Sequence, residues 1–480
     1  MATARRHSAV PSEPSSPFWD ALPGHCTGCE SRGAIGARHE WRGDTDGAMS
    51  DRDTDQDDEA GTRPHDGRVG VLRAWRSRTF ASLGNANYRR FFVGQAVSLT
   101  GTWMQSVAQA WLVLQLTHSA TWLGLAVALQ FLPVLVLGPY GGVVVDRVSK
   151  RRLLIATQLA AAAQALVLGL LTVSAAVSLF WVLALSLGLG LINVLDNPGR
   201  QAFVREMIPD DLVRNAVSLN SVLVNVARAV GPAVAGVLIA TAGLGTCFLV
   251  NSVSFVAVIF AFVTMDRSLL RPAAPVRRAP GQLRQGFRYV RRTSELLIPL
   301  LMMALVGTLT YEFQVVLPAL VTQTFHGGAR SYGLITAAMG LGAVLGGLAS
   351  AGRKVTGIAP MVLASATFGA ADLLTALTPT LELAAAALVA VGAASVWFLS
   401  SGNATLQMAA APAMRGRVMA LWAVAFLGST PVGGPLVGWV AQHAGPRWAL
   451  VLGAAAAFVA AAAGAVLGLR AGRRQARASP

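Results

Sequence analysis

Long apolar runs, separated by short polar turns, fill the chain from about residue 89 almost to its C-terminal end. Each run holds roughly 20 residues, the length that a helix needs to cross the hydrocarbon core of a bilayer. The runs are expected at 91–115, 121–145, 153–177, 178–196, 215–242, 245–265, 297–322, 331–352, 357–380, 383–408, 418–442 and 449–469. This pattern predicts an all-α membrane protein with twelve transmembrane helices.

Polar segments at the start and in the middle of the chain divide these runs into two groups of six. The expected domains are a disordered cytoplasmic N-terminal tail (1–88), a six-helix half (89–265), a cytoplasmic linker with an amphipathic helix (266–296), a second six-helix half (297–470) and a basic C-terminal tail (471–480). Residues 1–88 are rich in Arg, Asp, Gly, Ser and Pro, a composition typical of disorder. They show no signal-peptide pattern. Met49 begins an acidic leader and is an alternative translation start, which would leave 1–48 untranslated.

Composition agrees with a membrane protein and indicates its orientation. Hydrophobic residues make up 54% of the chain and charged residues only 13%, with a mean hydropathy of +0.54, whereas a soluble protein carries about a quarter charged residues. The net charge of +16 comes largely from arginines in alternate loops and tails, so it requires no nucleic-acid partner. Basic loops stay on the cytoplasmic side, which places both termini there. The lone C-x-x-C at Cys26 and Cys29 lacks a second ligand pair, so no metal site is expected.

Landmarks of the first half recur in the second half at a nearly constant spacing. Parallel repeats of this kind are typical of transporters built from two matching halves. Because proline removes a backbone N–H and glycine lets helices approach, the repeated Gly-Pro pairs are expected to permit helix bending. Arg214 and Arg417 are 203 residues apart, as are Gly231–Pro232 and Gly434–Pro435, and Gly142 and Gly347 are 205 residues apart.

The turn GVVVDRVSKRR at 142–152 resembles the signature of the major facilitator superfamily between the second and third spans, with Ser149 in place of its second glycine. Over 85–472 the chain also resembles the enterobactin-exporter-like, or transmembrane secretion effector, family. That resemblance rests on NYRRFFVGQAVSLTGTWM, DNPGRQAFVREMIPDDLVRNAVSLNS and RGRVMALW. It implies the major facilitator fold, with two pseudo-symmetric six-helix halves, and a multi-pass protein of a bacterial-type cell (inner or plasma) membrane.

The resemblance implies secondary active export of a drug, siderophore or secondary metabolite by alternating access with proton antiport. The implied partners are a small-molecule substrate, the lipid bilayer and a proton gradient, with no cofactor and a monomeric chain. No nucleophile motif or phosphate loop occurs in the spans, so an enzyme is not expected. Because a fold does not fix the direction of transport, an importer or facilitator of small molecules stays open as the alternative, and so does Na⁺ as the coupling ion.

The basic turn after the second span carries a candidate conformational latch. In the implied fold, Asp146 lies beside the start of the eleventh helix, where a carboxylate meets the positive end of a helix dipole. Asp196 can pair with Arg147 or Arg200. We expect this latch cluster to hold the outward-open state; the alternative is a turn that only fixes topology. Its members are Gly142, Asp146, Arg147, Arg151, Arg152, Asp196 and Arg200.

Glu312 is the only charged residue of the seventh run, and Arg228 is the only one of the fifth. An ionisable group at membrane depth faces the bundle interior or a water-filled cavity. Glu312 is therefore a candidate for proton coupling, and Arg228 can neutralise an anionic substrate or pair with Glu312. The alternatives are a hydrated acid near the outer mouth and a purely structural pairing of the arginine.

Polar and aromatic residues within the spans predict a cavity that suits amphipathic organic molecules. Gln105 and Gln109, for example, lie one turn apart on one helix face. The alternative is that such groups form hydrogen bonds between helices. Asp372 is expected at an outer interface, because the ninth span is peripheral in the implied fold. The candidate cavity residues are Trp103, Gln105, Gln109, Tyr311, Trp397, Ser401 and Asn403.

Overall fold

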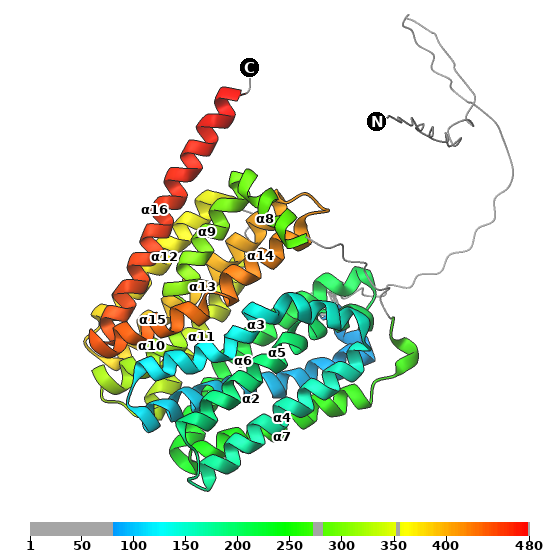
Figure 1. Ribbon diagram of the computed structural model, residues 1–480, viewed down its shortest axis with the longest axis vertical. Coiled ribbons are helices and arrows are strands. Elements are labelled where there is room, and N and C mark those ends of the chain that lie inside the picture. The colour runs from blue at the N-terminus through cyan, green and yellow to red at the C-terminus, as the bar shows by residue number, and fades with distance from the viewer. Residues whose placement is uncertain (1–79, 272–281, 352–355, 479–480) are drawn as a thin grey trace, which may run out of the picture. The chain divides into compact units, whose positions relative to one another are not determined.

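The computed structural model describes residues 80–271, 282–351 and 356–478 (Figure 1). Most of the expected N-terminal tail lies outside these ranges, together with Cys26, Cys29 and Met49, as do the central part of the linker and the last two residues. Within the described ranges the chain is helical throughout and contains no strand.

The first group of helices follows the expected order of six spans. Short 3₁₀ turns η1 (Ala81–Gly84), η2 (Asp210–Leu212) and η3 (Arg267–Leu269) precede, interrupt and follow it. The Asn85 side chain accepts a hydrogen bond from the Tyr88 amide and so caps the first helix. The six helices are α2 (Ala86–Thr117), α3 (Ala120–Arg147), α4 (Lys150–Val173), α5 (Leu179–Met207), α6 (Val213–Ala242) and α7 (Leu244–Val263).

The second group begins after the linker, in which α8 (Gln282–Arg292) is a separate short helix. Two of its spans are divided, the seventh into α9, α10 and a terminal π-helical turn η4, and the eleventh into α14 and α15. The elements are α9 (Ser294–Leu309), α10 (Phe313–Ala319), η4 (Leu320–Thr324), α11 (Ala329–Ala351), α12 (Ile358–Leu377), α13 (Leu381–Ala409), α14 (Arg415–Leu427), α15 (Thr430–His443) and α16 (Pro446–Ala478).

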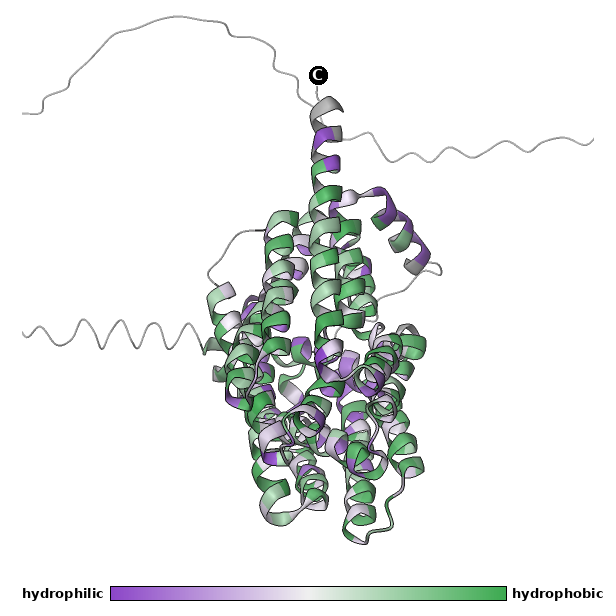
Figure 2. Cartoon of the chain, turned by 90° about the vertical axis from the view of Figure 1, so that its left-hand side faces the viewer, coloured by the Kyte–Doolittle hydropathy of each residue, from purple (hydrophilic) through white to green (hydrophobic). Residues whose placement is uncertain are grey.

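Eleven segments of the described chain are long and apolar enough to cross a membrane. The first helix, α2, is not among them, and it carries several glutamines along its 32 residues. It nevertheless packs along α6 and α7 as a member of the bundle (Figure 1). Hydrophobic residues cover most of the helices (Figure 2), and large apolar side chains such as Val253 and Phe260 of α7 are exposed, as expected of a lipid-facing surface.

Helix packing repeats from one group to the other. α3 packs on α5 as α11 packs on α13, and α4 packs on α7 as α12 packs on α16. The close approach depends on glycine: a Cβ at Gly190 of α5 would lie 2.4 Å from Gln130 O of α3, and one at Gly392 of α13 would lie 1.9 Å from Met339 O of α11. The internal repeat seen in the sequence is therefore also a repeat of structure.

The two largest contacts between the halves form one equivalent pair, α3 with α15 and α6 with α11, and α10 also contacts α2 and α3. A Cβ at Gly124 of α3 would lie 2.1 Å from Gly434 O of α15, and a Cβ at Gly333 of α11 would lie 2.6 Å from Pro232 O of α6. The Ala120 amide, at the start of α3, also donates to Gln442 Oε1 near the end of α15 at 2.8 Å. These contacts lie toward the turns that join α2 to α3 and α15 to α16, which we call the outer end.

The helix breaks lie at positions that the hydropathy pattern did not indicate. The seventh span opens at Thr310, Tyr311 and Glu312, and the eleventh opens at Gly428 and Ser429. Both Gly-Pro pairs instead lie inside regular helices, Pro232 in α6 and Pro435 in α15. At these pairs glycine serves close packing, since a Cβ at Gly231 would lie 2.6 Å from Trp103 Cβ.

Candidate functional site

A chain of buried amides links α2, α4 and α7 in the N-terminal half. Gln105 Nε2 donates to Gln164 Oε1 at 3.0 Å, and Asn251 Nδ2 donates to Gln105 Oε1 at 2.7 Å. Ser254 Oγ in turn donates to Asn251 Oδ1 at 2.9 Å. Gln105 therefore makes the interhelical hydrogen bonds that the sequence left open as the alternative to a cavity role.

A buried ion pair lies nearer the other end of the same half. Asp196 of α5, which is 2% exposed, is ion-paired with Arg200 one turn later. Its second oxygen accepts from Thr157 Oγ1 at 2.8 Å and from Gln158 Nε2 at 2.7 Å. Arg200 also donates to Gln95 Oε1 of α2 at 2.9 Å. Three helices are thus joined around one carboxylate whose hydrogen-bonding capacity is well satisfied.

The other members of the latch cluster lie around the turn between α3 and α4. Arg151 Nε donates to Phe262 O at 2.6 Å and its Nη2 to Val263 O at 3.0 Å, which ties the start of α4 to the C-terminal end of α7. Lys150 Nζ lies 3.2 Å from Glu206 Oε1 of α5. Gly142 and Asp146 are half-buried, whereas Arg147 and Arg152 are exposed. The contacts of Lys150 and Arg151 join helices of the N-terminal half.

Glu312 occupies the N-cap position of α10, at the break in the seventh span, and is 2% exposed. Its Oε1 has no hydrogen-bond partner among the described residues, and Thr430 is its hydrogen-bonding neighbour. Two glycines of α15 leave the space for it: a Cβ at Gly433 would lie 2.8 Å from Glu312 Oε1, and one at Gly434 would lie 3.7 Å from Oε2. Since an uncompensated buried carboxylate is costly, this site is suited to holding a proton.

Arg228 of α6 packs against α2. Its guanidinium carbon lies 4.8 Å from the centroid of the Trp103 ring, a cation–π geometry. Its Nε lacks a hydrogen-bond partner within the described part of the chain, and the same part contains no ion pair between Arg228 and Glu312. The Trp103 ring therefore positions the guanidinium, and its Nε–H can donate to another group.

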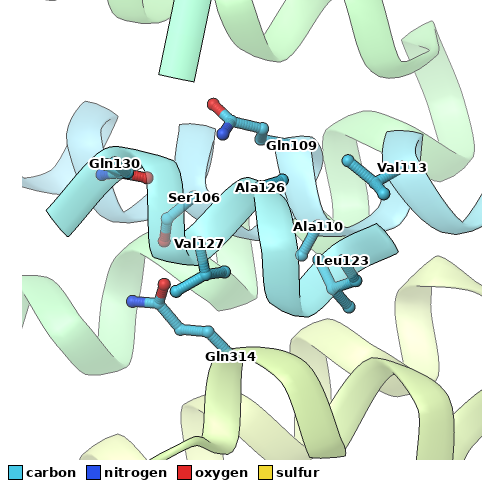
Figure 3. A pocket seen from close by; sticks show the side chains of 9 residues that line it. All are labelled: Ser106, Gln109, Ala110, Val113, Leu123, Ala126, Val127, Gln130 and Gln314. Atoms are coloured by element: carbon cyan, nitrogen blue, oxygen red, sulfur yellow. The ribbon is translucent and has the colours of Figure 1, made fainter. Parts of the chain in front are cut away.

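A small cavity lies between α2, α3 and α10 (Figure 3). Its polar side chains come from all three helices, with Ser106 and Gln109 on α2, Gln130 on α3 and Gln314 on α10. Gln109 also donates to Ser186 Oγ of α5 at 2.9 Å. The sequence predicts Gln109 as a cavity residue but not Gln130 or Gln314, although each is an amide within an apolar run. The remaining lining is Ala110, Val113, Leu123, Ala126 and Val127.

The other predicted cavity residues lie apart from this cavity. Tyr311 donates its hydroxyl to Ser395 O at 2.6 Å, and its ring makes edge contacts with Phe368 and Phe426. Ser401 is buried in α13, and Asn403 of the same helix accepts from Gln407 Nε2 at 2.6 Å. Trp397 is partly buried against the same hydrophobic core. The structure therefore distributes the predicted set over both halves.

Asp372 of α12 is not at an outer interface but is 1% exposed. Its Oδ1 has no hydrogen-bond partner among the described residues. Its other oxygen faces Gly453 of α16, where a Cβ would lie 2.9 Å away. The sequence does not predict this burial, because it depends on contacts with distant parts of the chain. In the fold, α9 of the seventh span packs against both α12 and α16. No group of three or more His, Cys, Asp and Glu side chains in the described ranges could hold a metal ion.

Comparison with known proteins places this arrangement among transporters. Residues 77–479 match the family model described as transmembrane secretion effector. The chain is 25% identical to the staphyloferrin A transporter of Staphylococcus aureus over 53% of its own length, and this match spans 64% of that transporter. It is 28% identical to the multidrug efflux pump Tap of Mycolicibacterium fortuitum (72% of this chain, 87% of Tap). It is 25% identical to the enterobactin exporter EntS of Escherichia coli O1:K1 (73% and 84%).

Solved structures share the fold at low sequence identity. The inward-facing, unoccupied structure of a bacterial homolog of the lysosomal transporter Spinster gives a TM-score of 0.64 at 15% identity, covering 80% of this chain and 96% of that one. The inward-facing structure of a bacterial homologue of ferroportin gives 0.63 at 14% identity, with coverage of 80% and 98%.

Proposed function

The chain belongs to the transmembrane secretion effector family of major facilitator transporters, and we propose that it exports small organic molecules by alternating access, driven by proton entry. The cargo class is a drug, siderophore or secondary metabolite. Relatives named for siderophore transport, enterobactin export, multidrug efflux and macrolide efflux support this class and this direction.

The observation that carries the proposal is the position of the contacts between the halves. They gather toward the outer end, where α3 meets α15 and α6 meets α11. Halves that meet at one end can rock about that contact and expose a central path at the opposite end. In a transporter with cytoplasmic termini, this is an inward-facing arrangement that can take cargo from the cytoplasm.

Proton coupling is assigned to Glu312. Its carboxyl group is buried at a helix break beside α15, a helix that makes one of the two largest contacts between the halves. A change in its proton occupancy alters the charge beside that contact. Protonation can therefore bias the equilibrium between inward-facing and outward-facing states.

The cluster around the α3–α4 turn is proposed to act in the opposite state. Its ion pair between Asp196 and Arg200 and the bonds of Arg151 make a rigid base for the turn. In the outward-open state, Asp146 would reach the N-terminal end of α14.

The protein would lie as a monomer in the plasma membrane, with both termini in the cytoplasm. Basic loops on that side support the orientation.

Ethidium efflux from cells that lack their own major efflux pumps tests the direction of transport. An exporter lowers the cellular fluorescence, and dissipation of the proton gradient restores it. Glu312→Gln should abolish the dependence on the gradient, whereas Glu382→Gln, which removes an exposed acid at the start of α13, should behave as wild type. Increased accumulation on expression would indicate an importer. Gradient-driven efflux by Glu312→Gln would remove the coupling assignment.

A further inference from the structure

The break in the seventh span separates two sets of helical hydrogen bonds. The amides of Thr310 and Tyr311 both donate to Val306 O, at 2.8 and 3.2 Å, which ends the first set. The second set begins at Glu312 O, which accepts from Val315 and Val316. The backbone carbonyl groups between the two sets lie against neighbouring helices and make no helical hydrogen bond within the seventh span.

Each of two such carbonyls meets a glycine on a different helix. A Cβ at Gly433 of α15 would lie 1.9 Å from Thr308 O, and a Cβ at Gly453 of α16 would lie 3.2 Å from Leu309 O. Beside the first glycine lies Glu312, and beside the second lies Asp372 of α12. The break thus has a buried carboxyl group on each side, toward α15 and toward the α12–α16 pair.

The surroundings of Asp372 offer acceptors rather than donors. The Thr310 hydroxyl donates its proton to Gly453 O at 2.8 Å, so its free lone pairs can only accept. Leu309 O, which shares the Gly453 contact with Asp372 Oδ2, is also an acceptor. Within the described side chains, Asp372 has no ion pair, and its Oδ1 has no hydrogen-bond partner. A carboxyl group in such a place must bring its own proton or bind another cation.

Charged groups on the packed elements do not supply the compensation. α12 packs against α9, α13 and α16. Arg447, at the start of α16, is bonded to Thr378 O at the end of α12. The titratable groups at the break of the seventh span are Tyr311, whose ring contacts Phe368 one turn from Asp372, and Glu312, which faces α15 on the opposite side. The other charged residues with described side chains on these elements, Glu295, Glu382, Arg470 and Arg473, lie toward the helix ends.

The equivalent place in the N-terminal half is filled without a charge. Gly169 of α4 precedes Asp372 by 203 residues, and Leu249 of α7 precedes Gly453 by 204. In the N-terminal half the glycine lies on α4 and the larger side chain on α7, since a Cβ at Gly169 would lie 2.8 Å from Leu249 Cδ2. A glycine–leucine pair therefore closes the contact between α4 and α7. Since the fold can close this contact with apolar groups, the acid in the C-terminal half has a role other than packing.

We propose that Asp372 is a second proton-binding site of the transport cycle, placed behind the break of the seventh span and opposite Glu312. This inference rests on the proposed proton-driven transport. Binding forms one O–H bond on the Asp372 carboxylate with a proton that enters from water, and release breaks the same bond, with no electron transfer. The protonated group donates to acceptors at the break, so its occupancy affects how α9 and α10 are held against α12 and α16.

Infrared spectroscopy of the purified full-length protein in lipid reads proton occupancy directly, without any transported compound. The C=O stretch of protonated carboxyl groups is followed from low to high pH. We expect Asp372→Asn to lose one such band, Asp372→Glu to retain one at a shifted frequency, and the exposed-acid control Glu382→Gln to keep the buried bands of wild type. Asp372→Glu also separates loss of the proton from loss of folding.

Two results would overturn the proposal. One is an Asp372→Asn spectrum that keeps all buried carboxyl bands of the wild type. The other is a band that responds to added Na⁺ at constant pH, which would make the site a sodium site. A separate assay in liposomes, with the pH dye pyranine inside and ethidium as the transported probe, tests the proposed function. If the wild type shows no proton-coupled flux, the proposed function is rejected. The infrared spectra then still decide whether Asp372 binds a proton.

Discussion

Adding one methyl group at Gly124 tests whether the contact between α3 and α15 holds the outer end closed. A Cβ at this position would lie 2.1 Å from Gly434 O, 2.6 Å from Gly434 C and 3.1 Å from Pro435 Cα. A relaxed carbon–oxygen contact is about 3.3–3.6 Å. All three atoms belong to backbone, so no side-chain rotation can relieve the overlap. α15 must therefore withdraw from α3 by about 1 Å.

The expected cost follows from this geometry. Overpacking of a well-packed contact destabilises by about 1–3 kcal/mol, and about 1.4 kcal/mol changes an equilibrium tenfold. Because the overlap exists only while the outer end is closed, Gly124→Ala should shift the population toward the outward-facing state by roughly 5- to 150-fold.

Distances between spin labels at Gln115 of α2 and His443 of α15, both exposed, would report this shift when Cys26, Cys29 and Cys247 have been replaced. Gly138→Ala is the matched control: it lies on the same helix, and a Cβ there would meet nothing within 4 Å. The two variants share the helix-propensity gain of about 1 kcal/mol from Gly to Ala. Identical distance distributions for both variants would refute the view that this contact closes the outer end.

Three further perturbations probe contacts inside each half. Asp196→Asn leaves Arg200 without its ionic partner and should lower the free energy of unfolding by up to about 3 kcal/mol. The control Asp210→Asn, at an exposed position, should leave it unchanged. Equal unfolding temperatures for the two variants would contradict the structural role of the pair. Thr310→Val removes the hydrogen bond to Gly453 O and should lower the free energy of unfolding by about 1 kcal/mol. The control is Thr367→Val, on the exposed face of α12. Equal free energies of unfolding would show that this hydrogen bond does not stabilise the break in the seventh span. Hydrogen bonds from the Ser268 hydroxyl and amide lower the pKa of Asp266, outside the membrane. The stabilisation that these hydrogen bonds give is present at neutral pH and lost as the pH falls through the lowered pKa of Asp266. Ser268→Ala should therefore lower the unfolding temperature at pH 7 but not at a pH below that pKa. An equal loss of unfolding temperature at every pH would reject this linkage.

The helices and their repeat could be predicted from the sequence because both depend on local signals. Apolar length sets the spans, and Arg214 with Gly231–Pro232 recurs as Arg417 with Gly434–Pro435. The helix breaks could not be predicted in this way. Apolar residues on both sides of Thr310 and Glu312 make the seventh run long enough to be predicted as one span, and the break depends on glycines at 433 and 453, more than 120 residues later.

The candidate site was predicted in part. Burial of Glu312 follows from its isolation in an apolar run, and the structure places it in the interior. The partners of individual side chains were not predictable, because they belong to distant helices. Arg228 meets the Trp103 ring, and Gln105 is bonded to Asn251 rather than left to line a cavity. The resemblance predicts an outer interface for Asp372, because the ninth span is peripheral in the implied fold, whereas in the structure Asp372 is buried beside Gly453 of α16.

In the two largest contacts between the halves, α3 with α15 and α6 with α11, backbone atoms meet at glycines. Gln109, Gln130 and Gln314 line the cavity between α2, α3 and α10, and their side chains are not among the atoms that meet at these glycines. A substitution at one of these three amides therefore leaves the backbone contacts at the glycines in place, so the lining of the cavity and the fit of the two halves can be altered independently of each other.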